Sequence, residues 1–296
     1  MPSSIAAELV AVIVSVDEES PRVLASGAPA ALPHGPLEPQ HRSLQAGLRA
    51  WTREREGVEL GFVEQLYTFA DVGRSGRKGR TVAISYLGLT RAQGESGWVD
   101  VYDLLPWEDA RDGVPALASQ LGETLVGWAG RDGERLERTE HAFGLGDWAW
   151  RPELVLQRYE LLWEAGLVAE HGAGSTPSSS TAPATGPAML HDHRRILATG
   201  LARLRSTIQY RPVIFELMPP DFTLGQLQAT VEALAGQRVH KQNFRRTVQD
   251  QLGLVEPTGE TDRSTGGRPA ALYRFRSEVH AERRHVGTKF PRPRTR

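Results

Sequence analysis

The sequence contains no cysteine. Disulfide bonds, cysteine-ligated zinc, iron–sulfur clusters and thiol catalysis are therefore excluded. The sequence also lacks an apolar run of the roughly 18 residues needed to cross a bilayer. The apolar segment Leu9–Val16 is too short, charged residues flank it, and no basic segment precedes it, so it does not read as a signal peptide. We therefore expect a cytoplasmic protein with no membrane partner.

Charge is unevenly distributed along the 296 residues. The formal net charge is only -1, but the part from Met189 onward carries 19 Lys and Arg against 10 Asp and Glu, a net of +9. The preceding part carries 16 basic and 26 acidic residues, a net of −10. This asymmetry favours an anionic partner for the C-terminal part.

Residues 172–187 read GAGSTPSSSTAPATGP and contain neither a charge nor a bulky apolar side chain. Such a segment cannot form a core, so we expect a flexible linker. The predicted organisation is a first domain at 1–171, a linker at 172–188, a second domain at 189–277 and a basic disordered tail at 278–296. The tail carries six basic and no acidic residues over its last fourteen positions, which is also typical of a solvated end.

The first predicted domain mixes strands and helices. An apolar β-branched run predicts a strand over 6–16, and similar patterns predict strands over 64–71 and 81–90. Helical periodicity predicts helices over 43–55, with Ser43 as N-cap, over 115–128 and over 151–168. This composition indicates an α/β or α+β domain of about 170 residues.

The second predicted domain has the order of a winged helix-turn-helix. Helices are expected over 191–208, from the N-cap Thr223 to Gly236, and over 240–252. A short apolar strand, a loop containing Gly266-Gly267-Arg268 and a second strand ending at Phe275 follow. A polar third helix followed by a β-wing is the layout of a DNA-binding winged helix.

The third helix of this domain carries side chains that read base edges. Arg reads guanine, and Asn or Gln reads adenine, through paired hydrogen bonds. The candidate DNA-binding residues are Lys241, Gln242, Asn243, Arg245 and Arg246 on the helix, with Arg263 and Arg268 on the wing. A solvated helix face is the alternative, and the neighbouring helix and wing favour DNA binding.

The stretch from His191 to Phe275 resembles the winged-helix domain of the Nudix-related transcriptional regulators of NAD metabolism. The runs that carry the resemblance are HDHRRIL, LRSTIQYRP, FELMPPDFTLGQLQ, HKQNFRR and GRPAALYRF. The resemblance implies a repressor of NAD biosynthesis or salvage genes that binds double-stranded operator DNA as a homodimer.

The first domain resembles the Nudix-like domain of the same regulators. The runs FVEQLYTFAD and RTVAISYLGL are similar to Nudix strands, and VYDLLPWEDARDG and LQRYELLWEAGLV are similar to segments of the regulator subgroup. The resemblance implies an α+β fold, with an α/β-sandwich Nudix-like domain followed by a winged helix-turn-helix domain. It also implies an effector such as ADP-ribose, NAD or a related nucleotide, with no required cofactor.

The catalytic helix of the Nudix pattern has decayed in this sequence. Counting back from Gly57, the expected Arg-Glu pair falls on Ala50-Trp51, the Glu-Glu pair on Glu54-Arg55 and the upstream Glu on Arg42. One carboxylate beside an arginine is a poor Mg²⁺ site. We therefore expect no catalytic residue, no metal site and no enzyme activity. Two alternatives stay open: a pyrophosphatase with a DNA-binding appendage, and an adaptor that binds anions without sequence preference.

Candidate ligand-binding residues of the first domain are Arg74, Arg77 and Arg80, in the run GRSGRKGR, and Glu54. The arginines are suited to an anionic nucleotide, although a solvated hairpin loop has the same composition. His191 and His193 have the spacing of a metal pair but lack a third ligand nearby, so a polar helix start is favoured. The tryptophans are expected in the core or at an interface.

Overall fold

The computed structural model describes residues 5–17, 19–71, 81–91, 97–172, 185–251, 253–262 and 269–276. The strands are β1 (Ala6–Asp17), β2 (Ser20–Leu24), β3 (His34–Pro36), β4 (Val63–Phe69), β5 (Thr81–Leu89), β6 (Trp98–Asp100), β7 (Asp221–Thr223), β8 (Val255–Asp262) and β9 (Ala270–Phe275). The α-helices are α1 (Leu44–Glu56), α2 (Val101–Leu104), α3 (Ala116–Ala129), α4 (Gly133–Phe143), α5 (Val155–Glu164), α6 (His193–Thr207), α7 (Leu224–Ala235) and α8 (Lys241–Arg246). The shorter helical segments are η1 (Ala169–Gly172), η2 (Val213–Leu217) and the π-helical η3 (Thr247–Gln251). The predicted site residues Arg74, Arg77, Arg80, Arg263 and Arg268, the tail and most of the linker lie outside the described residues.

A mixed six-stranded sheet forms the N-terminal part. Its order is β4-β5-β1-β2-β6, and β3 pairs with β1. β1 and β5 are parallel, whereas the other pairs are antiparallel. β1 is the central strand, and seven consecutive residues of it, 9–15, are buried. A strand with both faces covered requires this continuous apolar run.

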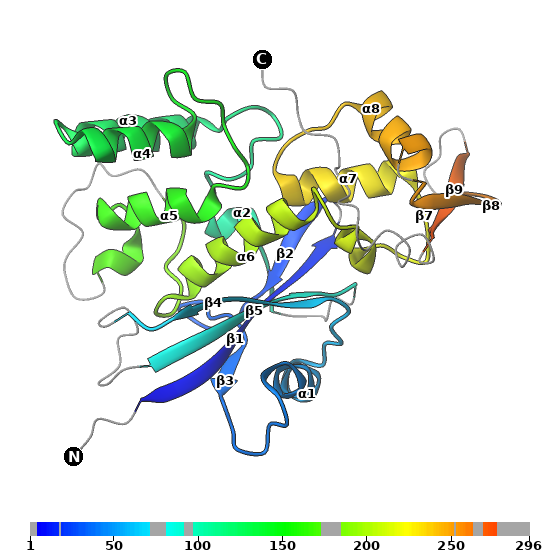
Figure 1. Ribbon diagram of the computed structural model, residues 1–296, viewed down its shortest axis with the longest axis horizontal. Coiled ribbons are helices and arrows are strands. Elements are labelled where there is room, and N and C mark those ends of the chain that lie inside the picture. Colours follow the sequence, from blue (N-terminus) through cyan, green and yellow to red (C-terminus); the bar gives the residue numbers. More distant parts are fainter. Residues whose placement is uncertain are drawn as a thin grey trace.

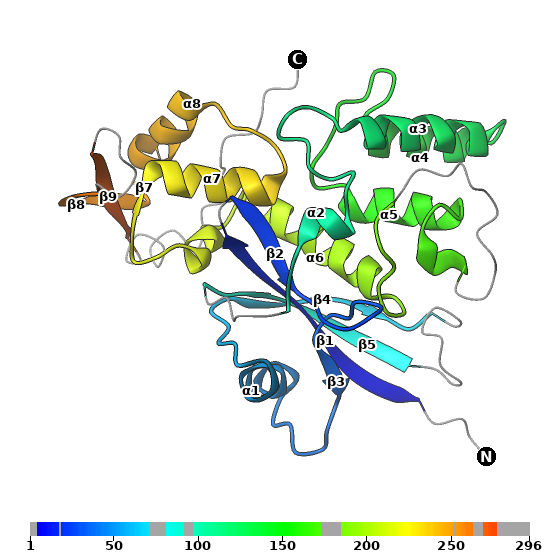
Figure 2. The same ribbon diagram turned by 180° about the vertical axis from the view of Figure 1, so that it is seen from behind.

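Two cores lie on opposite faces of the sheet. Successive side chains of a strand point to opposite faces, so Val10 and Val12 join the larger core and Leu9 and Ile13 the smaller one. The smaller core is closed by α1, while α5, α6 and α7 lie on the other face (Figures 1 and 2). The α1 cap is as predicted, because the Ser43 side chain accepts a hydrogen bond from the Ala46 N–H.

Helix α6 packs directly on the sheet. At Gly200 an added Cβ would lie 2.8 Å from a Val12 methyl group, so this close approach requires glycine. The predicted apolar stripe of α6 is confirmed, since each of its members is buried: Ile196, Leu197, Leu201, Leu204 and Ile208. The second predicted domain therefore shares its core with the first, and the predicted boundaries stay predictions.

Helix α5 begins later than the sequence pattern indicates. The pattern predicts a start at Arg151, whereas the helix starts at Val155. The Arg151 carbonyl accepts a hydrogen bond from Arg158 Nη1 at 3.0 Å, and the Pro152 carbonyl accepts one from Arg205 Nη1 at 2.9 Å. Buried arginine side chains thus take the acceptors that a first helical turn would use.

The C-terminal part is a winged helix. β7, β9 and β8 form a three-stranded antiparallel sheet in that order, to one side of α7 and α8 (Figure 1). Thr223 caps α7 in a full capping box with Gln226, and Gly236 ends the helix, as predicted. Stacked rings of Phe215 and Phe275, 4.2 Å apart, join η2 to the last strand. Among the described residues no helix has the length and apolarity required for a membrane span.

Candidate nucleic-acid interface

The helix that carries the candidate DNA-reading residues, α8, is short, and buried apolar side chains attach it to the core. Phe244 and Val248 are fully buried; α8 contacts α7, and η3 contacts α8 and β8. The continuous α-helix predicted over 240–252 is wrong in detail, because the chain changes to π-helical hydrogen bonding from Thr247. Such π segments are frequent at functional sites. Gln249 Nε2 donates to the Tyr273 hydroxyl at 2.9 Å and ties this segment to the wing strand β9.

The predicted reading residues share the outward side of α8. Lys241, Gln242, Arg245 and Arg246 are exposed, and Asn243 is half-buried. Among the described residues, Lys241, Arg245 and Arg246 have no carboxylate within ion-pair distance. A cationic surface left without internal partners is what a phosphate backbone or a base edge can neutralise.

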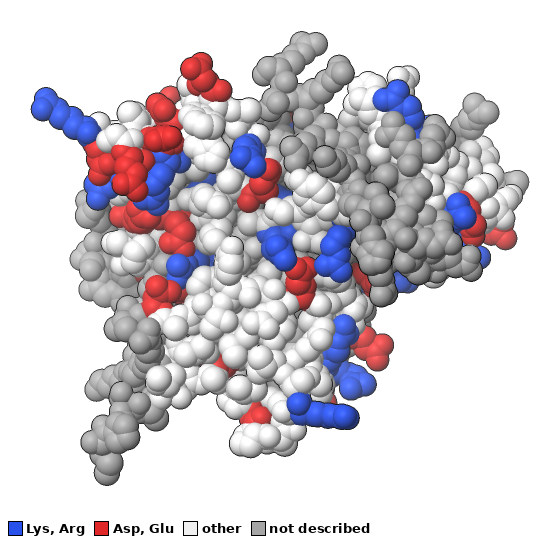
Figure 3. All heavy atoms as spheres, in the orientation of Figure 1, with Lys and Arg blue, Asp and Glu red and all other residues white. Residues whose placement is uncertain are grey.

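Other arginines of this part are neutralised within the molecule. Arg238 bonds Glu232 at 2.9 Å and Arg274 bonds Asp221 at 2.8 Å. In the N-terminal part, Lys or Arg and Asp or Glu side chains are interleaved over α3 and α4 (Figure 3). Within the described residues of the winged helix, the cations of α8 thus differ from Arg238 and Arg274. In the N-terminal part, Arg53 and Arg131 are also exposed without a carboxylate partner among the described residues.

A single carboxylate fixes the turn between α7 and α8. Glu232 is 5% exposed, accepts from the Val239 N–H at 2.9 Å and from Gln228 at 2.8 Å, and pairs with Arg238. Burial acts to raise the pKa of Glu232, but these hydrogen bonds outweigh it and leave the pKa below its usual value. The charged carboxylate thus sets the direction in which α8 leaves the turn.

Gly236 brings the same turn against the N-terminal part. Its φ of 63° lies in the left-handed region, and an added Cβ would lie 2.5 Å from both Arg205 Nη2 and the Glu108 carbonyl oxygen. The Gly236 carbonyl accepts a hydrogen bond from the Ala110 N–H at 2.8 Å. The loop after α2 therefore contacts the backbone that leads into the candidate reading helix.

A buried ionic network lies beneath this contact. Glu108 accepts from Arg158 at 2.6 and 2.8 Å and from Arg205 at 2.6 Å, and all three side chains are at most 1% exposed. Burial opposes the charge on Glu108, but the two guanidinium groups outweigh it and lower the pKa of Glu108. Arg205 also donates to the Leu234 carbonyl at the end of α7, at 2.9 Å.

Tyr102 adds a second link from α2 to α7. Its hydroxyl donates to the Ala233 carbonyl at 2.5 Å, and burial raises the pKa of Tyr102 to about 12. The sequence patterns do not mark Tyr102, Glu108, Arg158 or Arg205 as functional residues. Glu108 lies 50 positions from Arg158 and 97 positions from Arg205 in the sequence. A single charged residue in an amphipathic segment is normally expected to be exposed on the surface.

The remaining candidates that lie within the described residues are not gathered into one site. Glu54 is exposed on α1, on the face of the sheet opposite α6. His193 is 2% exposed, and its Nδ1 accepts from the Leu32 N–H at 3.0 Å, which is a structural role. Within the described residues no three His, Cys, Asp or Glu side chains are grouped as a metal site. Of the tryptophans, Trp107 is fully buried, whereas Trp148 is 44% exposed.

The fold is that of a Nudix-like domain joined to a C-terminal winged helix. Residues 214–275 match the family model described as the NrtR DNA-binding winged helix domain, so this part of the chain is similar to that domain. A curated relative, the "ADPR responsive transcriptional repressor NtrR" of Acinetobacter baylyi, is 43% identical over 86 residues. That match covers 28% of this chain and 33% of the relative, so the chain spans about a third of the relative's length.

Solved structures share the fold over nearly the whole chain. NrtR of Shewanella oneidensis, solved with a 27mer DNA, has a TM-score of 0.55 and 19% identity, covering 96% of this chain and 97% of that chain. The structure of the same protein without DNA has a TM-score of 0.56 and 19% identity, covering 97% of this chain and 98% of that chain. A MutT/nudix family protein from Enterococcus faecalis has a TM-score of 0.54 and 17% identity, covering 93% of this chain and 90% of that chain. At these identities the likeness establishes the two-part fold alone.

Proposed function

We propose that this protein is a DNA-binding transcriptional regulator that represses genes of NAD biosynthesis or salvage. The observation that carries the proposal is the cationic side of α8, where Lys241, Arg245 and Arg246 have no carboxylate partner among the described residues, in a segment that matches the NrtR winged-helix family model. The name of the Acinetobacter relative, a transcriptional repressor, supports the sign of the regulation. The resemblance of the sequence to regulators of NAD metabolism supports the choice of genes.

The N-terminal domain is proposed to bind ADP-ribose, or a related NAD-derived nucleotide, without hydrolysing it. The ADPR response named for the relative supports the ligand. The decayed catalytic helix, in which Arg55 follows Glu54 and Ala50-Trp51 replace Arg-Glu, supports the lack of hydrolysis. A magnesium-dependent turnover assay on ADP-ribose and NAD is expected to give no product. Turnover that Glu54→Gln abolishes would instead establish a pyrophosphatase.

A homodimer is proposed as the DNA-binding form. A single winged helix reads a short half-site, and a two-fold dimer supplies two readers about one helical turn apart or a multiple of it. Light scattering on the full chain is expected to give about twice the monomer mass of 32.6 kDa. A monomer at micromolar concentration, with and without DNA, would contradict this assembly.

The test of the whole proposal is a titration of the purified full chain onto DNA from upstream of its own gene and of NAD biosynthesis genes. Fluorescence anisotropy is expected to show binding about 10³-fold or more tighter than to competitor DNA. Added ADP-ribose is expected to change that affinity. Equal affinity for operator and competitor DNA would favour the non-specific adaptor and overturn the proposal.

A further inference from the structure

A side-chain hydrogen bond joins the segment that carries the candidate DNA-reading residues to the wing, which is formed by β8 and β9. Gln249 Nε2, in η3 directly after α8, donates to the Tyr273 hydroxyl of β9 at 2.9 Å. We propose that Gln249 and Tyr273 are positioning residues for DNA binding. Their bond holds the wing at the angle to α8 at which both elements meet one duplex. This inference rests on the proposed function and adds the residues that orient its DNA-binding surface.

The base of the wing is attached to the same segment by backbone hydrogen bonds. The Leu254 N–H donates to the Val248 carbonyl at 3.2 Å, and the Arg276 N–H donates to the Leu254 carbonyl at 2.9 Å. These bonds lie together where β8 begins and β9 ends, so on their own they would act as a hinge. The bond to Tyr273 attaches β9 at a second point, further toward the tip of the wing. Two separate attachments fix a direction, whereas one leaves it free.

The pairing of β8 with β9 becomes irregular just beyond Tyr273. Pro257 of β8 pairs with Tyr273. The next pair toward the tip is Thr261 with Ala271, so β8 has extra residues in this interval, among them Gly259 with φ 86°. A bulge of this kind bends the strand and increases its twist. The outer part of the wing therefore takes its direction from a bend, and Tyr273 is the paired residue at which that bend begins.

Both partners of the bond are held by their surroundings. Tyr273 lies on the central strand of the three-stranded sheet, between Phe222 and Pro257, and its ring packs against the apolar core. Gln249 directly follows Val248, which is fully buried. The π-helical bonding of η3 adds a residue to the turn, so the side chains of η3 are rotated relative to an α-helix that continued α8. Gln249 thus faces the wing, and little freedom is lost when its bond to Tyr273 forms.

Such a bond changes DNA affinity through the free protein. The net contribution of one neutral hydrogen bond favours the bonded orientation about 5-fold. Without the bond the wing samples other angles, and DNA that needs one orientation binds more weakly by the fraction of molecules that hold it. Random DNA is held mainly by phosphate contacts, which do not require both elements at fixed positions. Loss of the bond should therefore lower selectivity as well as affinity.

Fluorescence anisotropy of full-chain variants on operator and competitor DNA tests the bond. Tyr273→Phe removes only the hydroxyl, and Gln249→Met keeps the side-chain length but removes the donor. Each variant is expected to weaken operator binding about 5-fold and competitor binding less than about 2-fold. The double variant is expected to bind no more weakly than either single variant, because both changes remove the same bond. Urea unfolding establishes that each variant is folded under the conditions of the binding measurement.

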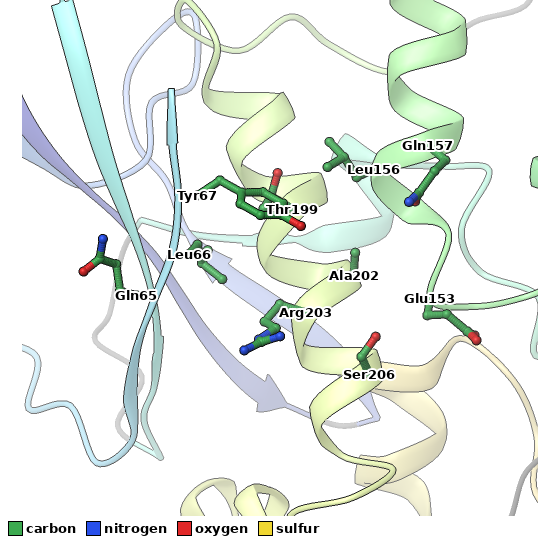
Figure 4. Close-up of a pocket in the computed structure, with 10 residues that line it drawn as sticks. All are labelled: Gln65, Leu66, Tyr67, Glu153, Leu156, Gln157, Thr199, Ala202, Arg203 and Ser206. Atoms are coloured by element: carbon green, nitrogen blue, oxygen red, sulfur yellow. The ribbon is translucent and has the colours of Figure 1, made fainter. Parts of the chain in front are cut away.

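Tyr86→Phe is the matched control. The Tyr86 hydroxyl donates to Gln65 Oε1 at 3.5 Å, so the same two residue types are bonded on the N-terminal sheet. Gln65 extends from β4 away from α6 (Figure 4), and the pair is not part of the winged helix. Tyr86→Phe is expected to change operator affinity less than about 2-fold. A loss equal to that of Tyr273→Phe would show that the effect is not local and would overturn the proposal.

The remaining outcomes separate this inference from the proposed function. Additive losses in the double variant would mean that Gln249 and Tyr273 act independently, for example by touching DNA, and would overturn the positioning role. Unchanged selectivity in Tyr273→Phe would do the same. Both results leave the proposed function standing, because wild type still prefers the operator. Wild type that binds operator and competitor equally would instead refute the proposed function, and this inference with it.

Discussion

At the residue scale, an arginine's availability to bind DNA depends on whether it is already held in an ion pair. Arg246 and Arg274 are both exposed arginines of the winged helix, but within the described residues only Arg274 has a carboxylate partner, Asp221. An arginine already held in an ion pair must give up that pair before it binds DNA, whereas an unpaired one loses only water. The difference between them makes a controlled test of the reading helix possible.

Arg246→Ala and Asn243→Ala are each expected to weaken operator binding by about 1–3 kcal/mol and random DNA binding much less. The reason is that paired hydrogen bonds to a base edge exist only on the correct sequence. The measurement is affinity against salt concentration on both DNAs. Arg274→Ala, on β9, is the control and is expected to change neither affinity by more than a few tenths of a kcal/mol.

Arg268, which lies outside the described residues, is predicted from the sequence to contact phosphate. Arg268→Ala is therefore expected to weaken both DNAs alike and to reduce the salt slope by about one ion. If Asn243→Ala and Arg268→Ala gave identical profiles, α8 would not be the reading element.

At the element scale, the sequence predicts the helices that carry their own signals. α6 and α7 have complete apolar stripes, and α7 also has a capping box and a terminal glycine. The starts and ends set by distant side chains were not predictable. α5 starts late because Arg205, 53 positions away, binds the Pro152 carbonyl. The short strands β2, β3 and β6 were also missed, since runs of three to five residues carry little periodicity. Helix α4 was missed as well, although Asp132 caps it and Gly144 ends it.

The glycines that end α7 and α1 have similar left-handed φ angles but different neighbours. Comparing them separates the energetic cost of the close contact at the α7–α8 turn from the cost of the backbone angle. Gly236 ends α7 with φ 63°, and Gly57 ends α1 with φ 66°. An added Cβ at Gly57 meets nothing within 4 Å, whereas at Gly236 it meets Arg205 and Glu108. Gly57→Ala is thus expected to cost only the strain of the left-handed angle, about 1–2 kcal/mol.

Gly236→Ala is expected to cost about 1–3 kcal/mol more than Gly57→Ala, because the added methyl also overpacks the network. Urea unfolding of the two variants measures the difference. Operator affinity is expected to fall only in Gly236→Ala, since only that turn orients α8. Equal stability losses would mean that the loop after α2 yields freely and does not fix the turn.

At the scale of the whole molecule, the two parts of the chain are joined by buried charge as well as by apolar packing. Glu108 from the N-terminal part, Arg158 from α5 and Arg205 from α6 form one desolvated group. Such a network is costly to desolvate and stabilises the fold only while every member is present. The sequence could not predict it, because the charges become partners only after the sheet has brought α5 and α6 together. It makes the orientation of the winged helix depend on the integrity of the N-terminal part.

Glu108→Gln is expected to destabilise the protein by about 3–5 kcal/mol at pH 7, because it leaves two buried guanidinium groups without a counter-charge.

The pKa of Glu108 in the wild-type protein is lowered on folding. The ionised carboxylate therefore contributes stability that is complete above the usual carboxyl pKa and is lost as the pH falls below it. The stability of wild type measured by urea unfolding should therefore fall on acidification below about pH 4.5 more steeply than that of Glu108→Gln. Asp109→Asn is the neighbouring control: within the described residues its carboxyl, 31% exposed, pairs with Arg111 alone, and its loss is expected to cost about 1 kcal/mol. If Glu108→Gln kept the stability and the acid response of wild type, the network would not hold the two parts together. The orientation of α8 would then depend on apolar packing alone.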